Sequence, residues 1–505
     1  GRPEGYSEED SVNPRSVYAK TKLAGEEAVR LNYPDAIIAR VVFYGWSLLG
    51  NRSLSEFFFN HLCLSQKMKG FTDVMFSPLY VEDLAKILLE IGNILNDRSE
   101  KEIELAKIVD LFPQAASKKN NIPINLFCGG GKDLSKEEAD RCIEEVLSDK
   151  NIDIVVETIG GSSEYILNLV LKILNSKKHL VTANKALLAK YGKEIFETAE
   201  KNNVSVGFEA SVCGAIPIIK AVKECFTGDV IESISGIMNG TSNYILSKMK
   251  FEGKSFAEAL KMAQNLGYAE ADPTLDINGG DAGNKLAILL KLAFGLNASM
   301  SQIPITGIDK IEQEDMDFAN EMNCTIKLIC YAKKDGKKIF ATVRPMMIKN
   351  DNFLSNINGA INAVKLINKY SGEHILVGKG AGSTETGSAI VSDIIFIAKY
   401  KDNISNKSAT SDVCLTDEDE TEFPYNISFE TKNVPGITGA VTTAIGDSNI
   451  NIDTVGHNRH NKSKAIFSVA TMPCKLSQIK KAIDQIKTSR PDILKSEPKI
   501  IPILY

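Results

Sequence analysis

The chain has 505 residues, of which 43% are hydrophobic and 24% are charged, and its formal net charge is −5. A chain of this length is expected to form about three or four domains rather than one. The small negative charge and the lack of Lys- and Arg-rich runs argue against nucleic-acid and membrane-surface partners, and no apolar run approaches the ~20 residues that span a bilayer. Nine scattered cysteines, with no C-x-x-C spacing, favour reduced thiols and a cytoplasmic location.

Residues 1–92 form the first predicted region, with a helical pattern over 17–31 and a short apolar strand over 36–43. Tyr18 and Lys22 make a Y-x-x-x-K pair on this helix, in which the lysine can lower the tyrosine pKa so that the phenol donates a proton. Together with segments 38–45 (IARVVFYG) and 76–85 (FSPLYVEDLA), the pair resembles the back half of an extended short-chain dehydrogenase of the dTDP-4-dehydrorhamnose reductase type. The resemblance implies a fragment of a sugar-nucleotide reductase. We expect it to be inactive, because the family's glycine-rich start is not in this region.

Residues 93–210 alternate apolar strands with amphipathic helices, which predicts a parallel, doubly wound sheet. The expected strands lie at 103–110, 152–157, 179–182 and 204–208, and the second is expected to be fully buried. Asp110 ends the first strand, where a dinucleotide fold uses an acid to accept from ribose hydroxyls, but a simple strand-end turn explains it equally well. No G-x-G-x-x-G turn precedes Ile103, so the predicted fold is a truncated Rossmann-type sheet.

Residues 211–400 contain the most informative segment of the chain, 267–285 (GYAEADPTLDINGGDAGNK). Its carboxylates can hold an ammonium group, and Lys285 follows Asp281 by one helical turn, where a lysine can exchange a proton. A helix at 281–294 and a strand at 339–343 are predicted around it, which indicates an α+β catalytic domain. The alternative interpretation is an exposed helical ion pair worth about 0.3 kcal/mol.

A polar, acidic stretch at 401–423 is predicted to be a linker. Residues 424–505 are then predicted to form a βαββαβ unit. Within that unit, 430–438 (ETKNVPGIT) and 449–453 (NINID) resemble an ACT domain, a small regulatory module that binds amino acids at paired interfaces. The resemblance implies an amino-acid effector and a homo-oligomer. A dimerisation module without a ligand is the alternative.

Five segments resemble homoserine dehydrogenase and occur in that family's order: 155–161 (VVETIGG), 181–185 (VTANK), 208–217 (FEASVCGAIP), 237–244 (IMNGTSNY) and 267–270 (GYAE). The resemblance implies an NAD(P)-dependent oxidoreductase that interconverts L-homoserine and L-aspartate 4-semialdehyde in threonine, methionine and isoleucine biosynthesis. It leaves the choice between NAD and NADP open. A catalytically impaired amino-acid-binding regulatory protein is the alternative, because the phosphate-binding glycine turn is missing.

The resemblance also implies roles for individual side chains. Reduction of an aldehyde by a hydride builds negative charge on the carbonyl oxygen, so a cationic acid must neutralise it. Lys285 is the expected proton donor, and Lys185 is expected to share that role or to orient the cofactor. Asp281 is the third expected catalytic residue, and the substrate's amino and hydroxyl groups are expected on Glu270, Asp276 and Asp281.

Two further sets of residues follow from the same resemblance. The cofactor is expected to contact Asp110, Thr158, Lys185, Gly267 and Gly380, the last within a glycine loop at 378–382 (GKGAG). A monovalent cation, Na⁺ or K⁺, is expected on the Glu209 carboxylate with the carbonyls of Val212, Gly214 and Ile216.

Overall fold

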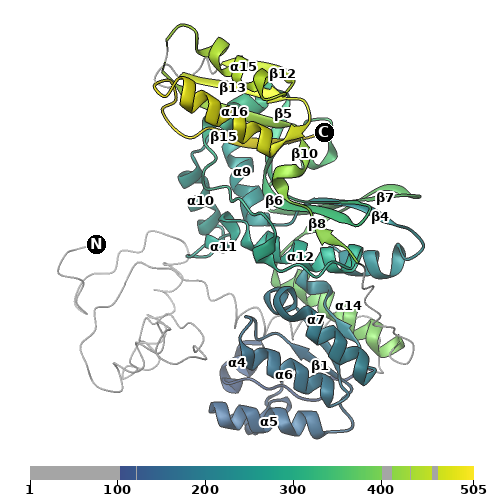
Figure 1. The fold of residues 1–505 in the computed structure, drawn as a ribbon. Helices are drawn as coiled ribbons and strands as arrows, with labels where there is room; N and C mark the ends of the chain where they lie inside the picture. Colours follow the sequence, from purple (N-terminus) through teal and green to yellow (C-terminus); the bar gives the residue numbers. More distant parts are fainter. Residues whose placement is uncertain (1–102, 121, 401–411, 433, 458–464) are drawn as a thin grey trace, which may run out of the picture. The chain divides into compact units, whose positions relative to one another are not determined.

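The computed structural model of the chain describes residues 103–120, 122–400, 412–432, 434–457 and 465–505 (Figure 1). All of these residues belong to one compact unit that begins at Asp83. The predictions for residues 1–92, including the helix with Tyr18 and Lys22, lie outside the described residues. Within the described ranges, no helix is long and apolar enough to cross a membrane.

A small parallel sheet organises the region before residue 210. Its strand order is β1-β2-β3, with β1 at Ile154–Glu157, β2 at His179–Thr182 and β3 at Val206–Gly207. The helices of this region are α4 (Pro113–Asn120), α5 (Lys136–Ser148), α6 (Glu164–Asn175) and α7 (Lys185–Asn202). The parallel sheet predicted from the alternating pattern is therefore present.

The two faces of this sheet are covered by different helices. Successive residues of a strand point to opposite faces, so Leu180 packs with the core that contains α6 and α7, whereas Val181 packs against Ile390 and Ile394. The latter two residues belong to α14 (Ser383–Tyr400), which contacts β2 and β3. A helix far along the chain therefore returns to cover the second face of this sheet (Figure 1).

Two strand predictions in this region were wrong in detail. Within 103–110, Ile108 alone makes a β-type pairing, a single parallel bridge to Phe127, because this segment bonds to the turn at 124–131 and exposes its polar side chains. Strand β1 was expected to be fully buried, but three of its four residues are only half-buried. The reason is its place at the edge of the described sheet, where β2 covers one side alone.

A larger, mostly antiparallel sheet follows in the order β6-β5-β4-β7-β8. Its strands are β4 (Ile231–Ile237), β5 (Cys324–Asp335), β6 (Lys338–Lys349), β7 (Ile361–Asn368) and β8 (Gly372–Lys379). Helix α8 (Ile218–Lys220) precedes the sheet. The helices between β4 and β5 are α9 (Gly240–Glu252), α10 (Phe256–Asn265), α11 (Thr274–Ile277), α12 (Gly280–Phe294) and α13 (Gln313–Glu321). Of these, α9, α12 and α13 contact β5 directly.

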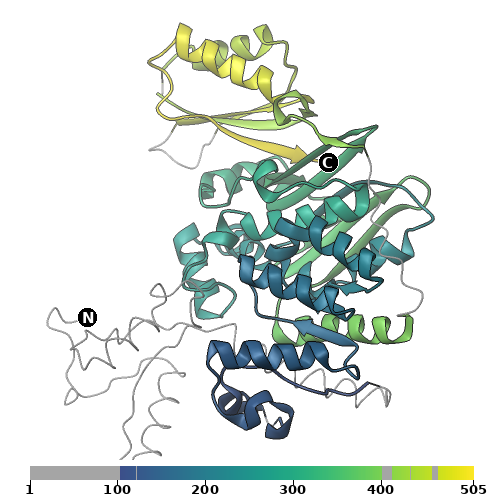
Figure 2. The same cartoon turned by 60° about the horizontal axis from the view of Figure 1, so that its bottom comes forward.

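The last region contains six main elements in the predicted order. They are β11 (Tyr425–Thr431), α15 (Ile437–Asp447), β12 (Ile452–His457), β13 (Ala465–Thr471), α16 (Leu476–Ser489) and β15 (Lys499–Leu504). In Figure 2 both helices lie on one face of the module's sheet, where they share a core with Ile427 and Phe429. We call residues 424–505 the C-terminal module.

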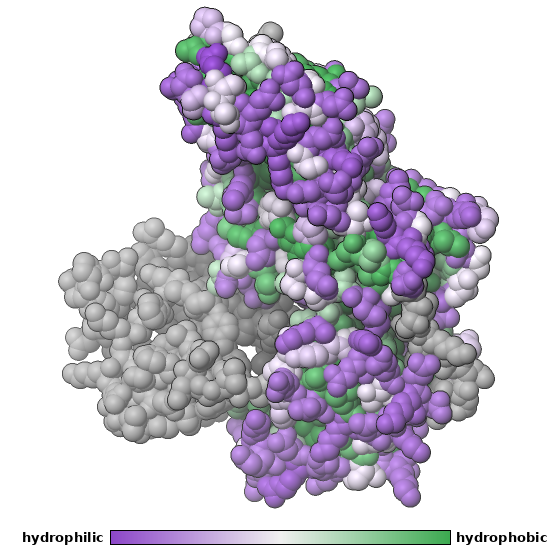
Figure 3. All heavy atoms as spheres, in the orientation of Figure 1, coloured by the Kyte–Doolittle hydropathy of each residue, from purple (hydrophilic) through white to green (hydrophobic). Residues whose placement is uncertain are grey.

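The C-terminal module is joined to the larger sheet rather than tethered beside it. Strand β15 pairs in parallel with β6, Ile503 opposite Met347, so the two sheets form one continuous ten-stranded sheet. The predicted linker is also partly regular, because β9 (Cys414–Leu415) pairs with β6 and β10 (Glu422–Phe423) pairs with β14 (Cys474–Lys475). The visible surface of the described residues is mostly hydrophilic, with small separate apolar patches (Figure 3).

Candidate active site

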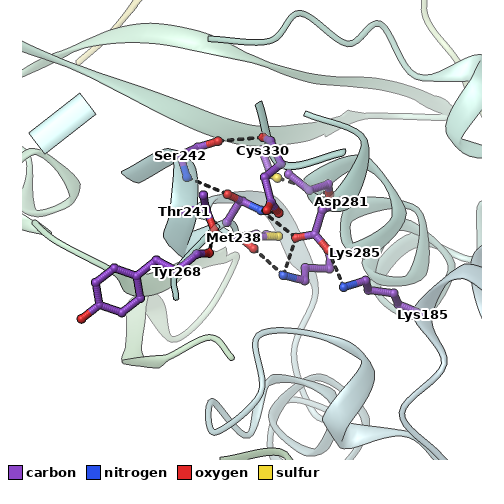
Figure 4. A network of polar contacts seen from close by, with 11 residues as sticks. Lys185, Met238, Thr241, Ser242, Tyr268, Asp281, Lys285 and Cys330 are labelled. Carbon is purple, nitrogen blue, oxygen red and sulfur yellow. Dashed lines mark hydrogen bonds and ion pairs between the residues drawn. The ribbon is translucent and has the colours of Figure 1, made fainter. Parts of the chain in front are cut away.

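Asp281 is the centre of a buried polar cluster at the start of α12. One of its carboxylate oxygens, Oδ2, accepts from Lys285 Nζ at 2.7 Å and from Asn239 Nδ2 at 2.9 Å. The other, Oδ1, lies 2.5 Å from Lys185 Nζ (Figure 4). Lys285 also donates to the Met238 carbonyl at 2.7 Å. The cluster therefore joins side chains from three helices, of which only the Asp281–Lys285 pair is close in sequence.

Asp281 and Lys285 are each only 6% exposed. This burial excludes the alternative interpretation of the sequence, in which the two residues form an exposed helical ion pair. Burial alone would raise the pKa of Asp281, but the charges of Lys285 and Lys185 hold it well below its usual value. Burial would likewise lower the pKa of Lys285, but the charge of Asp281 raises it above its usual range. Both groups are therefore ionised at neutral pH.

Lys185 comes from the region of the small parallel sheet and occupies the first residue of α7. Asn184 caps that helix by accepting from Leu187 N, and its amide also donates to the Gly161 carbonyl at 2.7 Å. A cation at a helix N-terminus opposes the helix dipole, so the contact with Asp281 offsets an unfavourable position. Its side chain stays 43% exposed, which leaves Lys185 accessible to a ligand.

The loop after β1 is fixed by a buried carboxylate. Glu157 accepts from Thr182 Oγ1 at 2.6 Å and from the backbone N–H groups of Ile159 and Gly160. The left-handed turn at Gly160 (φ 77°) and Gly161 (φ 82°) needs glycine. Thr158 lies in this turn at the carboxyl end of β1, the edge where ligands bind in parallel sheets.

Asn239 has a structural role that the sequence did not reveal. Its side-chain oxygen caps α9 by accepting from Ser242 N, while Nδ2 donates to Asp276 Oδ1 at 2.7 Å as well as to Asp281. An asparagine ahead of a helix predicts the cap. The contacts of Asn239 with Asp276 and Asp281 depend on α11 and α12, which bring the two carboxylates to the same amide.

The remaining predicted substrate residues lie beside this cluster. Burial raises the pKa of Asp276, and the charge of Asp281 adds to it. Glu270 is exposed, but desolvation and then the charge of Asp276 raise its pKa, while Lys185 lowers it. The structure therefore brings Glu270, Asp276, Asp281 and both lysines together. Of the three carboxylates, that of Glu270 is exposed to solvent.

Gly267, which has a φ of 77°, ends α10. The loop after it is held by the Tyr268 carbonyl, which accepts from Thr241 Oγ1 at 2.5 Å. Gly380 lies against the Asn362 side chain, so closely that a Cβ would overlap it. Asp110 belongs to the separate segment at 103–131, where its Oδ1 accepts from Phe112 N as in a strand-end turn.

Glu209, in the segment expected to hold a cation, is 3% exposed, and burial raises its pKa to about 7. Its two oxygens accept from Ile219 N at 2.8 Å and Lys220 N at 2.9 Å, which leaves further lone pairs on each oxygen. The chain turns tightly beside it, with left-handed φ values at Cys213 and Gly214. The structure therefore places the predicted cation ligand Glu209 as a buried carboxylate near this turn.

A parallel sheet whose carboxyl edge faces a buried lysine–aspartate cluster on a second domain defines a nicotinamide-dependent dehydrogenase as the class of protein. Comparison with known proteins identifies the family. Residues 217–395 match the family model described as homoserine dehydrogenase, and residues 89–209 match the one described as homoserine dehydrogenase, NAD binding domain.

Individual relatives agree with the family models. Homoserine dehydrogenase of Helicobacter pylori is 40% identical over 392 residues, which cover 77% of this chain and 89% of the relative. That of Neisseria gonorrhoeae is 41% identical over 352 residues, covering 66% and 80%. The crystal structure of a homoserine dehydrogenase from Thiobacillus denitrificans matches with a TM-score of 0.73 and 32% identity over 83% of this chain and 96% of that chain. This chain belongs to the homoserine dehydrogenase family.

The first region of the chain resembles a different family. Residues 1–104 match the family model described as RmlD substrate binding domain. This match confirms the resemblance seen at Tyr18, Lys22 and the two segments that follow them. The chain therefore carries parts similar to two kinds of oxidoreductase in succession.

Proposed function

We propose that the protein interconverts L-homoserine and L-aspartate 4-semialdehyde with NAD(P), in the cytoplasmic biosynthesis of threonine, methionine and isoleucine. The observation that carries this proposal is the position of Asp281, which joins Lys285 of the catalytic domain to Lys185 of the cofactor-binding region. The acid, Lys285, and the charged orienting group, Lys185, thus meet where a substrate would lie beside a nicotinamide ring. Both directions of the reaction use the same groups.

Lys285 is the proposed proton donor. The nicotinamide supplies the hydride in reduction and accepts it in oxidation when it is bound. In reduction, Lys285 Nζ gives its proton to the aldehyde oxygen, and in oxidation the neutral amine takes the hydroxyl proton. Because Asp281 holds the proton on Lys285, binding of a substrate ammonium to the same carboxylates should loosen that proton.

The carboxylates of Glu270, Asp276 and Asp281 are proposed to hold the amino and hydroxyl groups of the substrate. Asn239 donates to two of them, and these hydrogen bonds partly offset the repulsion between the two like charges. A ligand ammonium would lower the raised pKa values of Glu270 and Asp276. This supports an amino-acid substrate rather than a simple alcohol.

Residues 93–210, with α14, are proposed to bind the dinucleotide through Asp110, Thr158, Lys185, Gly267 and Gly380. The loop after β1 and the Gly380 loop suit the nicotinamide end, whereas the usual glycine turn for the pyrophosphate is not found ahead of Ile103. NAD and NADP are both proposed as cofactors. Glu209 and the carbonyls of Val212, Gly214 and Ile216 would hold Na⁺ or K⁺, whose charge would compensate the buried carboxylate.

The C-terminal module is proposed to be an ACT regulatory domain in a homo-oligomer, with residues 211–400 as the catalytic domain and 401–423 as the connection. Its βαββαβ order supports this proposal. The proposed effector is threonine, an end product of the proposed pathway. The continuous sheet through β15 and β6 gives such an effector a physical route to the catalytic domain.

The test is turnover of the purified full chain with L-homoserine and either NAD⁺ or NADP⁺. Failure with both cofactors in a folded sample overturns the proposal, and fluorescence titration with NADH and NADPH then distinguishes an impaired amino-acid-binding protein from one that binds no cofactor. The substrate 4-hydroxybutyrate, which lacks the amino group, should react far more slowly. Tyr18→Phe should leave homoserine oxidation unchanged, because the first region is expected to be inactive.

A further inference from the structure

Lys327 is a buried lysine on β5 with no described carboxylate partner. Its side chain is 1% exposed, yet Nζ donates to three oxygens: Asn243 Oδ1 at 2.9 Å, the Ile357 carbonyl at 2.6 Å and Asn358 Oδ1 at 2.9 Å. Three acceptors match the three N–H groups of an ammonium. A buried charge is costly, so a side chain held in this way needs an explanation.

The sheet geometry explains how Lys327 reaches these partners. Strand β4 pairs with β5 as far as Gly236 and Cys330, and then the chain leaves the sheet to begin α9. Beyond that point α9 lies beside β5, and the loop at 357–360 leads into β7. The ammonium therefore fills the junction where β4 has ended and a helix and a loop take its place.

Asn243 connects this junction to the active site. Its Nδ2 donates to the Ile357 and Ile361 carbonyls, and its backbone N–H donates to the Asn239 carbonyl one turn earlier. Asn239 in turn donates to Asp276 and Asp281. An unbroken series of hydrogen bonds thus runs from Lys327 to the carboxylate that holds Lys285.

We propose that Lys327 is a positioning residue for the homoserine site: it clamps the first turn of α9 against the loop at 357–361 and so holds Asn239 on the two site carboxylates. This rests on the proposed function. Lys327 touches neither substrate nor cofactor and acts through Asn243 and Asn239. This positioning role explains why a buried ammonium lies in the catalytic sheet, since no neutral side chain offers three donors from a single atom.

The charge on Lys327 is sensitive to its surroundings. Burial, and to a lesser extent the charge of Lys250, lower its pKa to about 7, while the three oxygen acceptors favour the protonated form. Lys250 lies on α9 and contacts Thr325, and it is the charged group that faces Lys327 in the described part of the chain. The neutral amine has two N–H groups and must release one acceptor.

The main experiment compares Lys327→Met with Lys250→Met in the full chain. Displacement of a site by about 1 Å can cost ~10²-fold, so Lys327→Met should raise KM for homoserine at least about tenfold, with kcat reduced less and NAD(P) affinity unchanged. Lys250→Met, at the same helix–strand junction, should leave neutral-pH kinetics within about twofold. Asn243→Leu should reproduce the defect, and the double variant should lose little more than either single one.

Two measurements keep the proposal testable if Lys327→Met folds poorly or the parent shows no turnover. Hydrogen exchange at 239–243 should be faster in Lys327→Met or Lys327→Gln than in Lys250→Met, whatever the activity. The basic limb of the KM–pH profile should move to higher pH in Lys250→Met. Unchanged exchange at 239–243, or an unchanged homoserine KM in Lys327→Met, overturns the inference, whereas an inactive parent overturns the proposed function instead.

Discussion

Replacement of Lys285 by methionine separates chemistry from packing at the active site. The side chain is 6% exposed and its Nζ contacts Asp281 and the Met238 carbonyl, both at 2.7 Å. Methionine preserves most of the buried volume and removes the ammonium. Loss of one proton donor typically lowers the rate by ~10²- to 10⁴-fold, so kcat for homoserine oxidation should fall in that range.

The same change has a calculable cost in stability. Removal of one partner from a buried ion pair typically costs ~3–5 kcal/mol, because the other charge is left unpaired. Here Lys185 and Asn239 still contact Asp281, so we expect a cost at the lower end of this range, about 3 kcal/mol. The double variant Asp281→Asn with Lys285→Met removes both buried charges of the pair. Lys185 then loses its contact with Asp281, but its side chain is 43% exposed and can be hydrated, so the free energy of unfolding should lie within about 1 kcal/mol of the parent.

The assay combines steady-state kinetics, cofactor binding by fluorescence and urea unfolding on the parent and the two variants. The double variant should regain stability without regaining turnover, while both variants bind NADH or NADPH as the parent does. Turnover of Lys285→Met within about threefold of the parent would refute the assignment of the proton donor. A double variant less stable than Lys285→Met would refute the argument from the buried pair.

Four other outcomes follow from the structure. Asn239→Ala should raise KM for homoserine and cost about 1–3 kcal/mol in urea unfolding, because the buried Asp281 and the half-buried Asp276 lose a shared donor. The low pKa of Asp281 means that its contribution to stability is present above its usual value of 3.8 and is lost as pH falls toward the folded pKa, so Asp281→Asn should flatten the acid limb of the stability–pH curve. Replacing Na⁺ and K⁺ by choline should lower activity and stability in the parent, and should have little effect in Glu209→Gln. Threonine should bind the C-terminal module by calorimetry and lower turnover, whereas Lys499→Met, which breaks contacts to Glu312 and Asp315, should keep binding and weaken inhibition.

Local patterns predicted the parts of the site that are local in sequence. The Asp281–Lys285 pair follows from helical spacing, and the alternation of apolar strands with amphipathic helices was sufficient to predict β2 and a helix after it. The acidic loop likewise indicated where carboxylates would gather. These features depend on contacts within about one turn or one strand.

Features that depend on distant contacts could not be predicted in this way. Asn239 reads as a helix cap, and its contacts with Asp276 and Asp281 arise only when α11 and α12 fold beside α9. The return of α14 to the cofactor sheet has no local signal, since an apolar helix can cover either domain. The segment at 103–110 has the alternation of a strand, but strand formation needs a neighbour, and its described partner is a turn.

The pairing of β15 with β6 has a consequence for how the chain is made. Strand β6 leaves the ribosome long before β15, and its other described partners on that side are a single bridge from Ile305 to Val343 and the two-residue β9 at Lys338 and Ile339. Met347 and Ile348, both 0% exposed in the finished fold, then lie on an open strand edge during synthesis. Such an edge is a template for pairing with other chains, so nascent chains stalled before residue 499 should be prone to aggregation and should depend on chaperones.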